Sequence, residues 1–296
     1  MKRKIVLVLV LALVVTLSAC SSVNQEDYDA LMAEKTVLET EKTDLQTELD
    51  SKMVGYTDQS VEAYGFTHGG YVGQVTIVVT NGVVDVEINE AFLPHTLAAV
   101  KLSTESAPTV WNETNTLTTG GKSYALYIML DEKTYKALDT EAGIVIYSVV
   151  DAEGAVKTGK WDVKNLEMNI ITNEMNMKAY YDALNNDGFK LLKSFGDTSP
   201  VVITEGQFKE GNPDYWQPSD GKLGWQANID ATEAFLEENG AAFDTLAFTK
   251  VLTTVDGVED TYWQILDSVA GATNSDFQDY FQLAQAAFGQ LETEVK

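Results

Sequence analysis

The single cysteine of this chain stands at position 20, at the end of an apolar run, and the rest of the sequence contains none. No disulfide can form within the chain, so its folded body must be held together by a hydrophobic core. Hydrophobic residues make up 45% of the 296 residues, which is typical of a packed globular protein. A chain of this length forms one large domain or two modest ones.

The first 19 residues are typical of an export signal. Three basic residues, Lys2 to Lys4, precede an apolar run of 13 residues, Ile5 to Leu17. That run is shorter than the roughly 20 residues that a membrane-spanning helix needs. It ends in Leu17-Ser18-Ala19-Cys20, which resembles the bacterial lipoprotein box.

The resemblance to the lipoprotein box implies that residues 1–19 are a signal peptide and that Cys20 becomes the lipid-modified first residue, carrying palmitate or a related acyl chain. The mature protein is then anchored by lipid on the extracytoplasmic face of the cell membrane. A plain secretory signal with an unrelated cysteine, or an uncleaved anchor, is the alternative.

The charge and the histidine content exclude several classes of function. The chain has 20 basic and 45 acidic residues, a net charge of −25, and loss of residues 1–19 makes it −28. A field of this sign repels phosphate backbones, so we expect no nucleic-acid partner. The two histidines, His68 and His95, are too few for a histidine-rich metal site. We predict that both are structural and that there is no metal site.

Residues 20–54 differ in composition from the rest of the chain, and their pattern predicts a helical stalk. Leu31, Leu38 and Leu45 recur every seven residues, but Lys35 and Lys42 occupy the complementary heptad position. The pattern favours a solvated spacer helix, and its residues 24–53 would span roughly 45 Å at 1.5 Å per residue. A weakly self-associating coiled coil or a partner-binding helix remains an alternative.

Residues 55–296 have the pattern of an α+β globular region. Asn81-Gly82 lies between two strand-like runs and predicts a hairpin. The expected strands are 71–79, 83–88 and 143–150, with 155–163 pairing back on the last of these. The expected helices are 174–184, 232–238 and 276–291, and 211–225 is expected to be loop. The two strand-rich stretches leave open a duplicated unit, divided into 55–170 and 171–296.

The most specific local pattern is Asp267-Ser-Val-Ala-Gly-Ala-Thr-Asn-Ser275, just before the clearest helix. Ser275 is a suitable N-cap, and Gln278 three residues later completes a capping box. The unpaired N–H groups and the positive dipole end at such a helix start favour an anion, phosphate in particular.

This pattern resembles the flavinylation motif of the FMN-binding domain family. Asp267, Gly271, Ala272 and Thr273 fit the motif, as does Ser275, whereas Ala270 replaces the usual serine or threonine. The resemblance implies that Thr273 carries FMN through a phosphoester, attached by a separate ApbE-type flavin transferase that uses FAD and magnesium. Asp267, Gly271 and Ala272 would form the recognition turn.

The strand–turn–strand that begins at Gly70-Tyr71-Val72-Gly73 also resembles the opening hairpin of these domains. Tyr71 and Thr273 are 202 residues apart, however, which is longer than the usual fold of the family. The resemblance therefore implies an FMN-binding-like fold with either a large insertion or a degenerate tandem unit.

Aromatic residues flank the motif and also fill the predicted loop. Tyr262, Trp263, Tyr280 and Phe281 either sandwich a flavin ring or belong to the core. Another group forms either a sugar-binding platform or local core under a long loop: Tyr215, Trp216 and Trp225.

Taken together, the sequence predicts a lipid-anchored flavoprotein that passes electrons to a membrane redox partner, as a carrier without substrate turnover of its own. The alternative is a solute-binding or surface interaction lipoprotein without a cofactor.

Overall fold

The structure of the protein is a computed structural model. It describes residues 32–33, 35–38, 40, 42, 56–212, 215–218, 223–241, 249–255, 258–264 and 278–293. The chain divides into two units at residues 54 and 55, and each is described by itself. The fold is α+β, as predicted.

The described residues between 32 and 42 are helical, as predicted for the stalk, and their side chains are exposed. The Thr36 and Thr40 hydroxyls each donate to the carbonyl oxygen four residues earlier, at 2.9 Å. Leu38, one of the heptad leucines, is 57% exposed. Among the described residues, no helix combines the length and the apolar character needed to cross a membrane.

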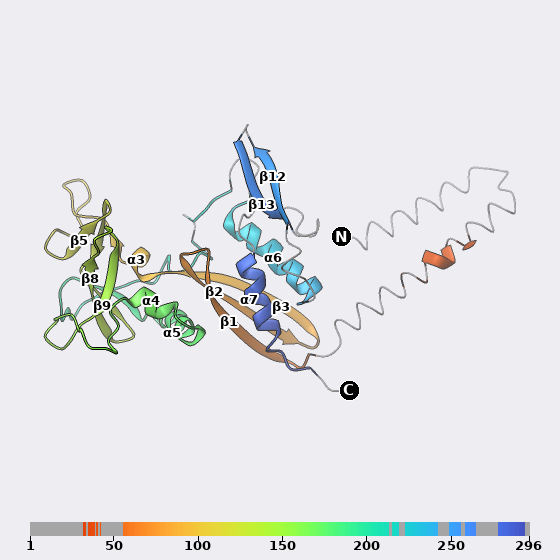
Figure 1. The fold of residues 1–296 in the computed structure, drawn as a ribbon, viewed down its shortest axis with the longest axis horizontal. Helices are drawn as coiled ribbons and strands as arrows, with labels where there is room; N and C mark the ends of the chain where they lie inside the picture. Colours follow the sequence, from red (N-terminus) through yellow and green to blue (C-terminus); the bar gives the residue numbers. More distant parts are fainter. Residues whose placement is uncertain are drawn as a thin grey trace. The chain divides into compact units, whose positions relative to one another are not determined.

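An antiparallel sheet opens the globular region, with strands β1 (Gln59–Thr67), β2 (Tyr71–Thr80) and β3 (Val83–Phe92) in that order (Figure 1). The predicted hairpin between β2 and β3 is confirmed. Its turn residues Asn81 and Gly82 both have positive φ, 53° and 75°. This is the backbone that a two-residue hairpin turn requires and that Asn-Gly adopts readily.

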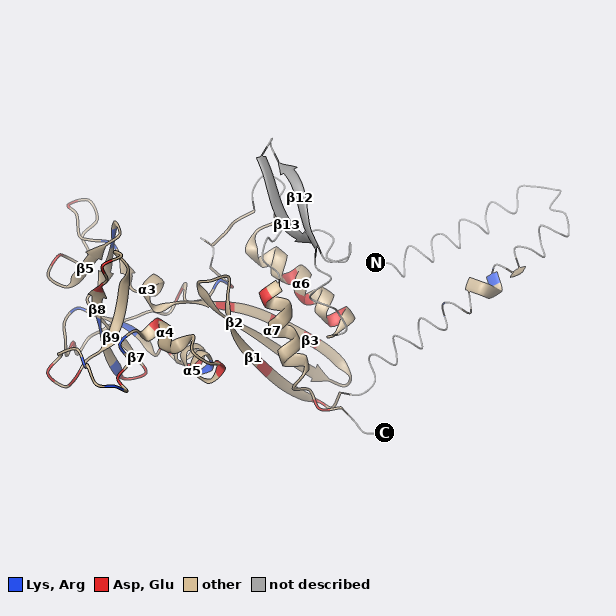
Figure 2. Cartoon of the chain, viewed as in Figure 1, with Lys and Arg blue, Asp and Glu red and all other residues tan. Residues whose placement is uncertain are grey.

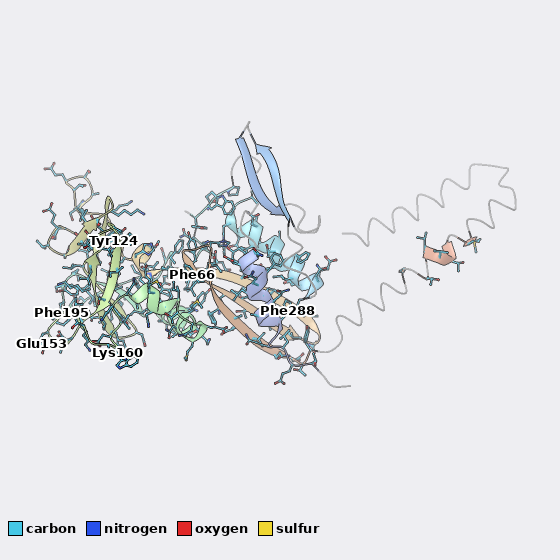
Figure 3. All side chains as sticks on the ribbon, in the orientation of Figure 1. Phe66, Tyr124, Glu153, Lys160, Phe195 and Phe288 are labelled. Carbon is cyan, nitrogen blue, oxygen red and sulfur yellow. The ribbon has the colours of Figure 1, made fainter. Side chains whose placement is uncertain are left out.

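Two helices from the end of the chain, α6 (Trp225–Asn239) and α7 (Gln278–Phe288), pack against this sheet. We call residues 56–92 and 207–293, which include this sheet and both helices, the terminal unit. Its hydrophobic core consists of residues from 63–88 and 225–291. The predicted apolar face of α7 is confirmed, because Phe281, Ala284 and Phe288 are buried. Figure 3 labels Phe288 in this core and Tyr124 in the other core of the globular region.

A glycine pair lets α7 approach the sheet closely. Gly65 of β1 pairs with Gly73 of β2. A Cβ atom on Gly73 would lie 2.6 Å from Thr67 Cγ2 and 3.3 Å from Leu283 Cδ2, and one on Gly65 would lie 3.2 Å from Leu283 Cδ1. The Leu283 side chain of α7 therefore occupies the space that side chains at these two positions would fill.

Glutamate side chains bind backbone N–H groups on the outer strands of this sheet. Glu174 accepts from Tyr64 N of β1 at 3.1 Å. On β3, Glu233 of α6 accepts from Ile88 N at 2.7 Å, and Glu237 accepts from Val86 N at 3.3 Å. Unpaired edge groups of this kind invite pairing with other chains, and these side chains occupy them.

Residues 93–206, the inserted unit, lie between β3 and α6 in sequence. One sheet has the order β4-β6-β5, and a second has the order β11-β10-β7-β8-β9. The strands are β4 (Ala99–Val100), β5 (Thr116–Thr119), β6 (Lys122–Ala125), β7 (Tyr127–Leu130), β8 (Lys133–Asp139), β9 (Val145–Val149), β10 (Phe189–Leu192) and β11 (Val201–Val202). The helices are α3 (Pro94–Leu97), α4 (Leu166–Ile170) and α5 (Glu174–Asn185).

The inserted unit confirms some local predictions and corrects one. The strand at 143–150 is β9, and the helix at 174–184 is α5, whose Asn173 cap accepts from Asn176 N at 2.9 Å. The predicted pairing of 155–163 with β9 is confirmed in part: Val150 forms a bridge with Val156, Val149 N donates to Val163 O at 2.9 Å and Lys157 N donates to Val149 O at 3.0 Å, but the stretch forms no strand of its own. A division of the chain at residue 170 would separate β10 from β7, the strand with which it pairs.

The end of the chain contains α6, the hairpin β12 (Thr249–Val255) and β13 (Val258–Gln264), and α7. Helix α6 is longer than predicted and begins within the expected loop, at Trp225. In its first turn the Asn228 side chain donates to the Gly224 and Leu223 carbonyls at 3.0 and 3.1 Å.

Candidate functional site

The site residues that the sequence predicts lie outside the described residues. This holds for Cys20 and for the whole motif, with Asp267, Gly271, Ala272, Thr273 and Ser275. The description resumes at Gln278, the first residue of α7 and five positions after Thr273. The first turn of α7 contacts a buried polar group, and this group is the candidate site.

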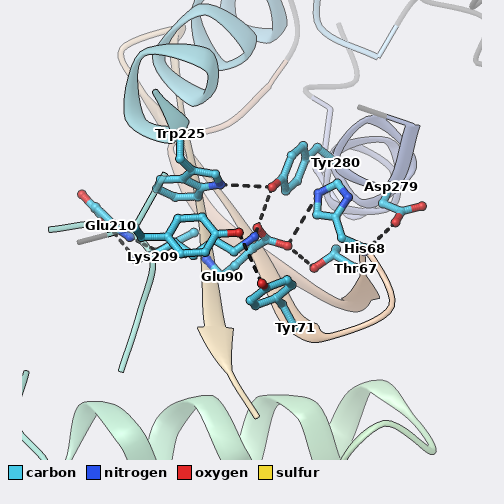
Figure 4. Close-up of polar contacts among 11 residues, drawn as sticks. Thr67, His68, Tyr71, Glu90, Lys209, Glu210, Trp225, Asp279 and Tyr280 are labelled. Carbon is cyan, nitrogen blue, oxygen red and sulfur yellow. Dashed lines mark hydrogen bonds and ion pairs between the residues drawn. The ribbon is translucent and has the colours of Figure 1, made fainter. Parts of the chain in front are cut away.

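Glu90 of β3 lies at the centre of this polar group, and it is fully buried. Its Oε2 accepts from the Tyr280 hydroxyl at 2.6 Å and forms an ion pair with Lys209 Nζ. Its Oε1 accepts from the Thr67 hydroxyl and lies 3.7 Å from His68 Nε2. We call the following set the Glu90 cluster (Figure 4): Thr67, His68, Tyr71, Glu90, Lys209, Tyr215, Trp225, Asp279 and Tyr280.

Backbone pairing brings Lys209 to Glu90 although 119 residues separate them. Phe92 N donates to Gln207 O at 2.9 Å, and Lys209 N donates to Glu90 O at 2.9 Å. Phe208 forms an antiparallel bridge with Ala91 between these two bonds. The segment that follows the inserted unit thus runs along the end of β3 and places the Lys209 side chain beside the Glu90 carboxylate.

The Lys209 ammonium group is enclosed by aromatic rings. Nζ lies 3.5 Å from the centroid of the Tyr71 ring, 4.7 Å from that of Tyr215 and 6.0 Å from that of Trp225. Its side chain is only 2% exposed. Burial lowers the pKa of Lys209, and the Glu90 carboxylate opposes this shift. The rings and the carboxylate together replace the water that a buried cation loses.

The starts of α6 and α7 meet at Tyr280. The hydroxyl of Tyr280 donates to Glu90 and accepts from the indole N–H of Trp225, the first residue of α6, at 3.3 Å. Both side chains are buried. Burial and the nearby carboxylate raise the pKa of Tyr280 well above its ordinary value, so this hydroxyl stays protonated and remains a donor.

The turn between β1 and β2 contributes His68, which adopts a positive φ of 48°. Its backbone N–H donates to Asp279 Oδ2 of α7 at 2.9 Å. Its ring lies edge-on to the Tyr280 ring, with centroids 4.7 Å apart. His95, the other histidine that the sequence predicts to be structural, pairs with Glu167 at 2.8 Å in the inserted unit.

The aromatic alternatives are partly resolved. Tyr280 and Phe281 are 1% and 0% exposed, and Trp225 is 3% exposed, so these three belong to the core. Tyr215 is half-buried and donates to the Tyr71 hydroxyl at 3.3 Å, while Trp216 is 37% exposed. The side chains of Tyr262 and Trp263 lie outside the described residues.

The chemistry of the cluster is that of proton donors and aromatic rings around one carboxylate. Glu90, Lys209, Tyr280 and Trp225 are at most 4% exposed, and they are bonded to one another. Within the described residues, no group of three or more histidine, cysteine or acidic side chains is arranged to hold a metal ion.

No protein-family model, characterised protein or solved structure matches this chain. Sequence reasoning missed Glu90 and Lys209. The only available signal was a charged residue inside the mostly apolar end of β3, and nothing in the sequence connects it with a lysine so far along the chain.

Proposed function

We propose that the protein is a lipid-anchored extracytoplasmic flavoprotein of the FMN-binding-domain type, with FMN attached to Thr273. It passes electrons in a membrane or extracellular electron-transfer chain. The observation that carries the proposal is the motif of Asp267 to Thr273 directly before α7, a helix whose first turn is bound to the Glu90 cluster. Thr273 and Gln278 are five positions apart, so covalent geometry keeps their Cα atoms within about 18 Å.

The attachment reaction is a phosphoryl-type transfer without oxidation or reduction. The Thr273 hydroxyl oxygen attacks the phosphorus on the FMN side of the FAD pyrophosphate. A new P–O ester bond forms to Oγ, the bridging P–O bond breaks, and AMP leaves with the bridging oxygen. The hydroxyl proton passes to a base of the flavin transferase, which also binds the magnesium ion that neutralises the pyrophosphate.

Bound FMN supplies reversible electron transfer, and the chain supplies attachment, ring contacts and electrostatics. Residues 56–92 and 207–293 contain 20 acidic residues and three lysines. Of these lysines, Lys209 is paired with Glu90. This excess of negative charge disfavours an anionic reduced flavin and lowers its reduction potential.

Covalent attachment and the lipid anchor suit the same location. Outside the cell, a dissociating FMN is lost by dilution, whereas a phosphoester retains it. The lipoprotein box at Cys20 supports retention of the protein itself at the membrane surface.

Intact-mass measurement after co-expression with a flavin transferase tests the proposal. We expect wild type to gain the mass of one FMN and Thr273→Ala to gain none. Thr158→Ala, which changes an exposed threonine of the inserted unit, is the control and should load fully. A wild-type protein that stays unmodified beside an active transferase would contradict the proposal and favour the interaction lipoprotein without a cofactor.

A further inference from the structure

We propose that residues 157–164 of the inserted unit, the Trp161 turn, are a contact site for an anionic phospholipid surface. The segment contains three lysines and one aspartate, in a chain whose net charge is −25. Trp161 is 88% exposed, the most exposed large hydrophobic side chain among the described residues. The proposal rests on the lipid-anchored location in the proposed function, and it does not depend on FMN.

Hydrogen bonds to β9 close the base of the Trp161 turn. Lys157 N donates to Val149 O at 3.0 Å, and Val149 N donates to Val163 O at 2.9 Å. β9 is an edge strand of the five-stranded sheet. Both ends of the turn are thus bound to one residue of this strand, and the residues between Lys157 and Val163 form a loop that the sheet holds closed.

A second set of bonds shapes the tip of the loop. Gly159 N donates to Asp162 Oδ2 at 2.7 Å, and Asp162 N donates to Gly159 O at 3.3 Å. The second bond is that of a β-turn, in which Lys160 and Trp161 occupy the two central positions. A Cβ atom on Gly159 would lie 2.5 Å from Asp162 Oδ2, so this position requires glycine. The aspartate is thus bound within the turn, while a lysine and a tryptophan form its tip.

The three lysines of the turn present their charges to solvent. Lys157, Lys160 and Lys164 are exposed, and none of them forms an ion pair with another described residue. Figure 3 labels Lys160 at the margin of the inserted unit. Its Nζ atom lies 4.7 Å from the centroid of the Trp161 ring. An ammonium group and an indole ring are therefore held next to each other at the surface.

This pair of groups has the chemistry that the headgroup layer of a bilayer accepts. The indole ring has an apolar body and one polar N–H, and tryptophan is enriched where hydrocarbon meets water. Lysines close to an anionic leaflet are attracted to its phosphate groups. A tryptophan at the tip of a turn enters a fluid headgroup layer without a preformed pocket. Stacking on a sugar is less favoured, because Lys160 covers one face of the Trp161 ring.

The charge distribution favours this contact over one made by the terminal unit. The terminal unit has three lysines and 20 acidic residues, so an anionic surface repels it. The inserted unit has ten lysines, and three of them lie in the eight residues of the Trp161 turn, which has an excess of two positive charges. Where acyl chains already hold the protein at a membrane, a weak second contact forms readily, because the anchor raises its effective concentration.

Vesicle co-sedimentation tests the proposal with the mature chain, residues 20–296, carrying Cys20→Ser so that no acyl chain contributes. Vesicles of phosphatidylglycerol and phosphatidylcholine supply the anionic surface, and vesicles of phosphatidylcholine alone supply the neutral one. Low ionic strength keeps screening weak. We expect wild type to bind the anionic vesicles preferentially. The partition coefficient should fall roughly fivefold for Lys160→Gln and roughly tenfold for Trp161→Ala, which loses the apolar surface of the ring.

Two control variants change exposed residues outside the Trp161 turn. Ile144→Ala alters a 60% exposed side chain in the turn before β9, and Lys122→Gln removes an exposed lysine at the start of β6. Both should partition like wild type. Since Lys160 and Trp161 are also exposed, none of these four changes empties the core, and near-ultraviolet circular dichroism confirms folding.

The proposal is overturned if wild type does not bind the anionic vesicles, if it binds the neutral vesicles equally well, or if Trp161→Ala binds as wild type does. A dimer in sedimentation velocity that Trp161→Ala abolishes, without vesicle binding, would overturn it in favour of a second copy of the chain as the partner. The chain in this experiment has neither an acyl chain nor FMN. Its failure therefore leaves the proposed function intact, and the intact mass of the native protein tests that function separately.

Discussion

The terminal unit and the inserted unit bury their polar groups in different ways. In the terminal unit, Glu90 and its partner Lys209 are charged and almost fully buried, with side-chain exposures of 0% and 2%. In the described residues of the inserted unit, the buried polar residues are neutral, Thr119 and Ser148. Within its described residues, the inserted unit therefore buries no charged side chain.

The same two regions also differ in charge. Residues 93–206 contain ten lysines and 15 acidic residues, whereas 56–92 and 207–293 together contain three lysines and 20 acidic residues. Figure 2 shows acidic residues along α6 of the terminal unit. One of the few lysines available to the terminal unit is therefore buried beside Glu90. Lys209 pairs there with the same carboxylate to which Tyr280 of α7 donates.

The largest effect is expected from Lys209→Met, which leaves the Glu90 charge buried without its partner. We expect the free energy of unfolding to fall by about 3–5 kcal/mol, measured by urea denaturation. Lys193→Met is the control from the inserted unit. It removes a partly exposed pair with Asp197 at 3.7 Å and should cost no more than about 1 kcal/mol.

The double variant Lys209→Met, Glu90→Leu sharpens this test. It removes both charges and should recover most of the loss, because an apolar replacement for a buried pair is often tolerated. If Lys209→Met alone lowers the free energy of unfolding by no more than Lys193→Met does, the two units do not differ in how strongly they depend on their ion pairs.

Gly73→Ala should produce the next largest effect. The new Cβ would lie 2.6 Å from Thr67 Cγ2, the side chain whose hydroxyl donates to Glu90, and 3.3 Å from Leu283 Cδ2 of α7. We expect a loss of about 1–3 kcal/mol from overpacking. Gly70→Ala is the control, since no other atom lies within 4 Å of its added Cβ. Equal thermal unfolding temperatures for the two variants would contradict the close contact of α7.

Turn glycines should behave alike in both units. Gly82 in the β2–β3 turn and Gly121 in the β5–β6 turn have φ of 75° and 76°, and no atom lies within 4 Å of a Cβ added to either. Each change to alanine should therefore cost about 1–2 kcal/mol, the penalty of the left-handed backbone. If chemical denaturation shows unequal losses of unfolding free energy for the two variants, the units differ at these turns in more than local backbone geometry.

A further expected effect is a dependence of stability on pH in the terminal unit. Burial raises the pKa of Glu233 to about 7, from an ordinary value of 4.5. Because the folded state binds this proton more tightly, the stabilisation is complete below pH 4.5 and is lost as pH rises to about 7. Glu233→Gln should reduce this fall in urea titrations between these pH values. Glu237→Gln, one turn later on α6, retains Glu233 and should keep the fall.

Much of the local structure was predictable because neighbouring residues encode it. The Asn81-Gly82 turn needs only two residues that accept positive φ, and the buried face of α7 follows from residues spaced three and four apart. The strand β9 and the helix α5 were predictable for the same reason. The predictions were less accurate at the boundaries of elements, as at 155–163, which pairs with the end of β9 without forming a strand, and at the early start of α6.

The candidate site illustrates the same limit. The sequence by itself determined the motif before α7, the lone cysteine and the acidic excess, since each is a property of adjacent residues or of composition. Only the tertiary structure decided that Glu90, Lys209 and Tyr280 meet. Their charges and hydroxyls carry no sequence signal of partnership across 119 and 190 residues. The pairing depends on chain segments that come together only when the hydrophobic core excludes water.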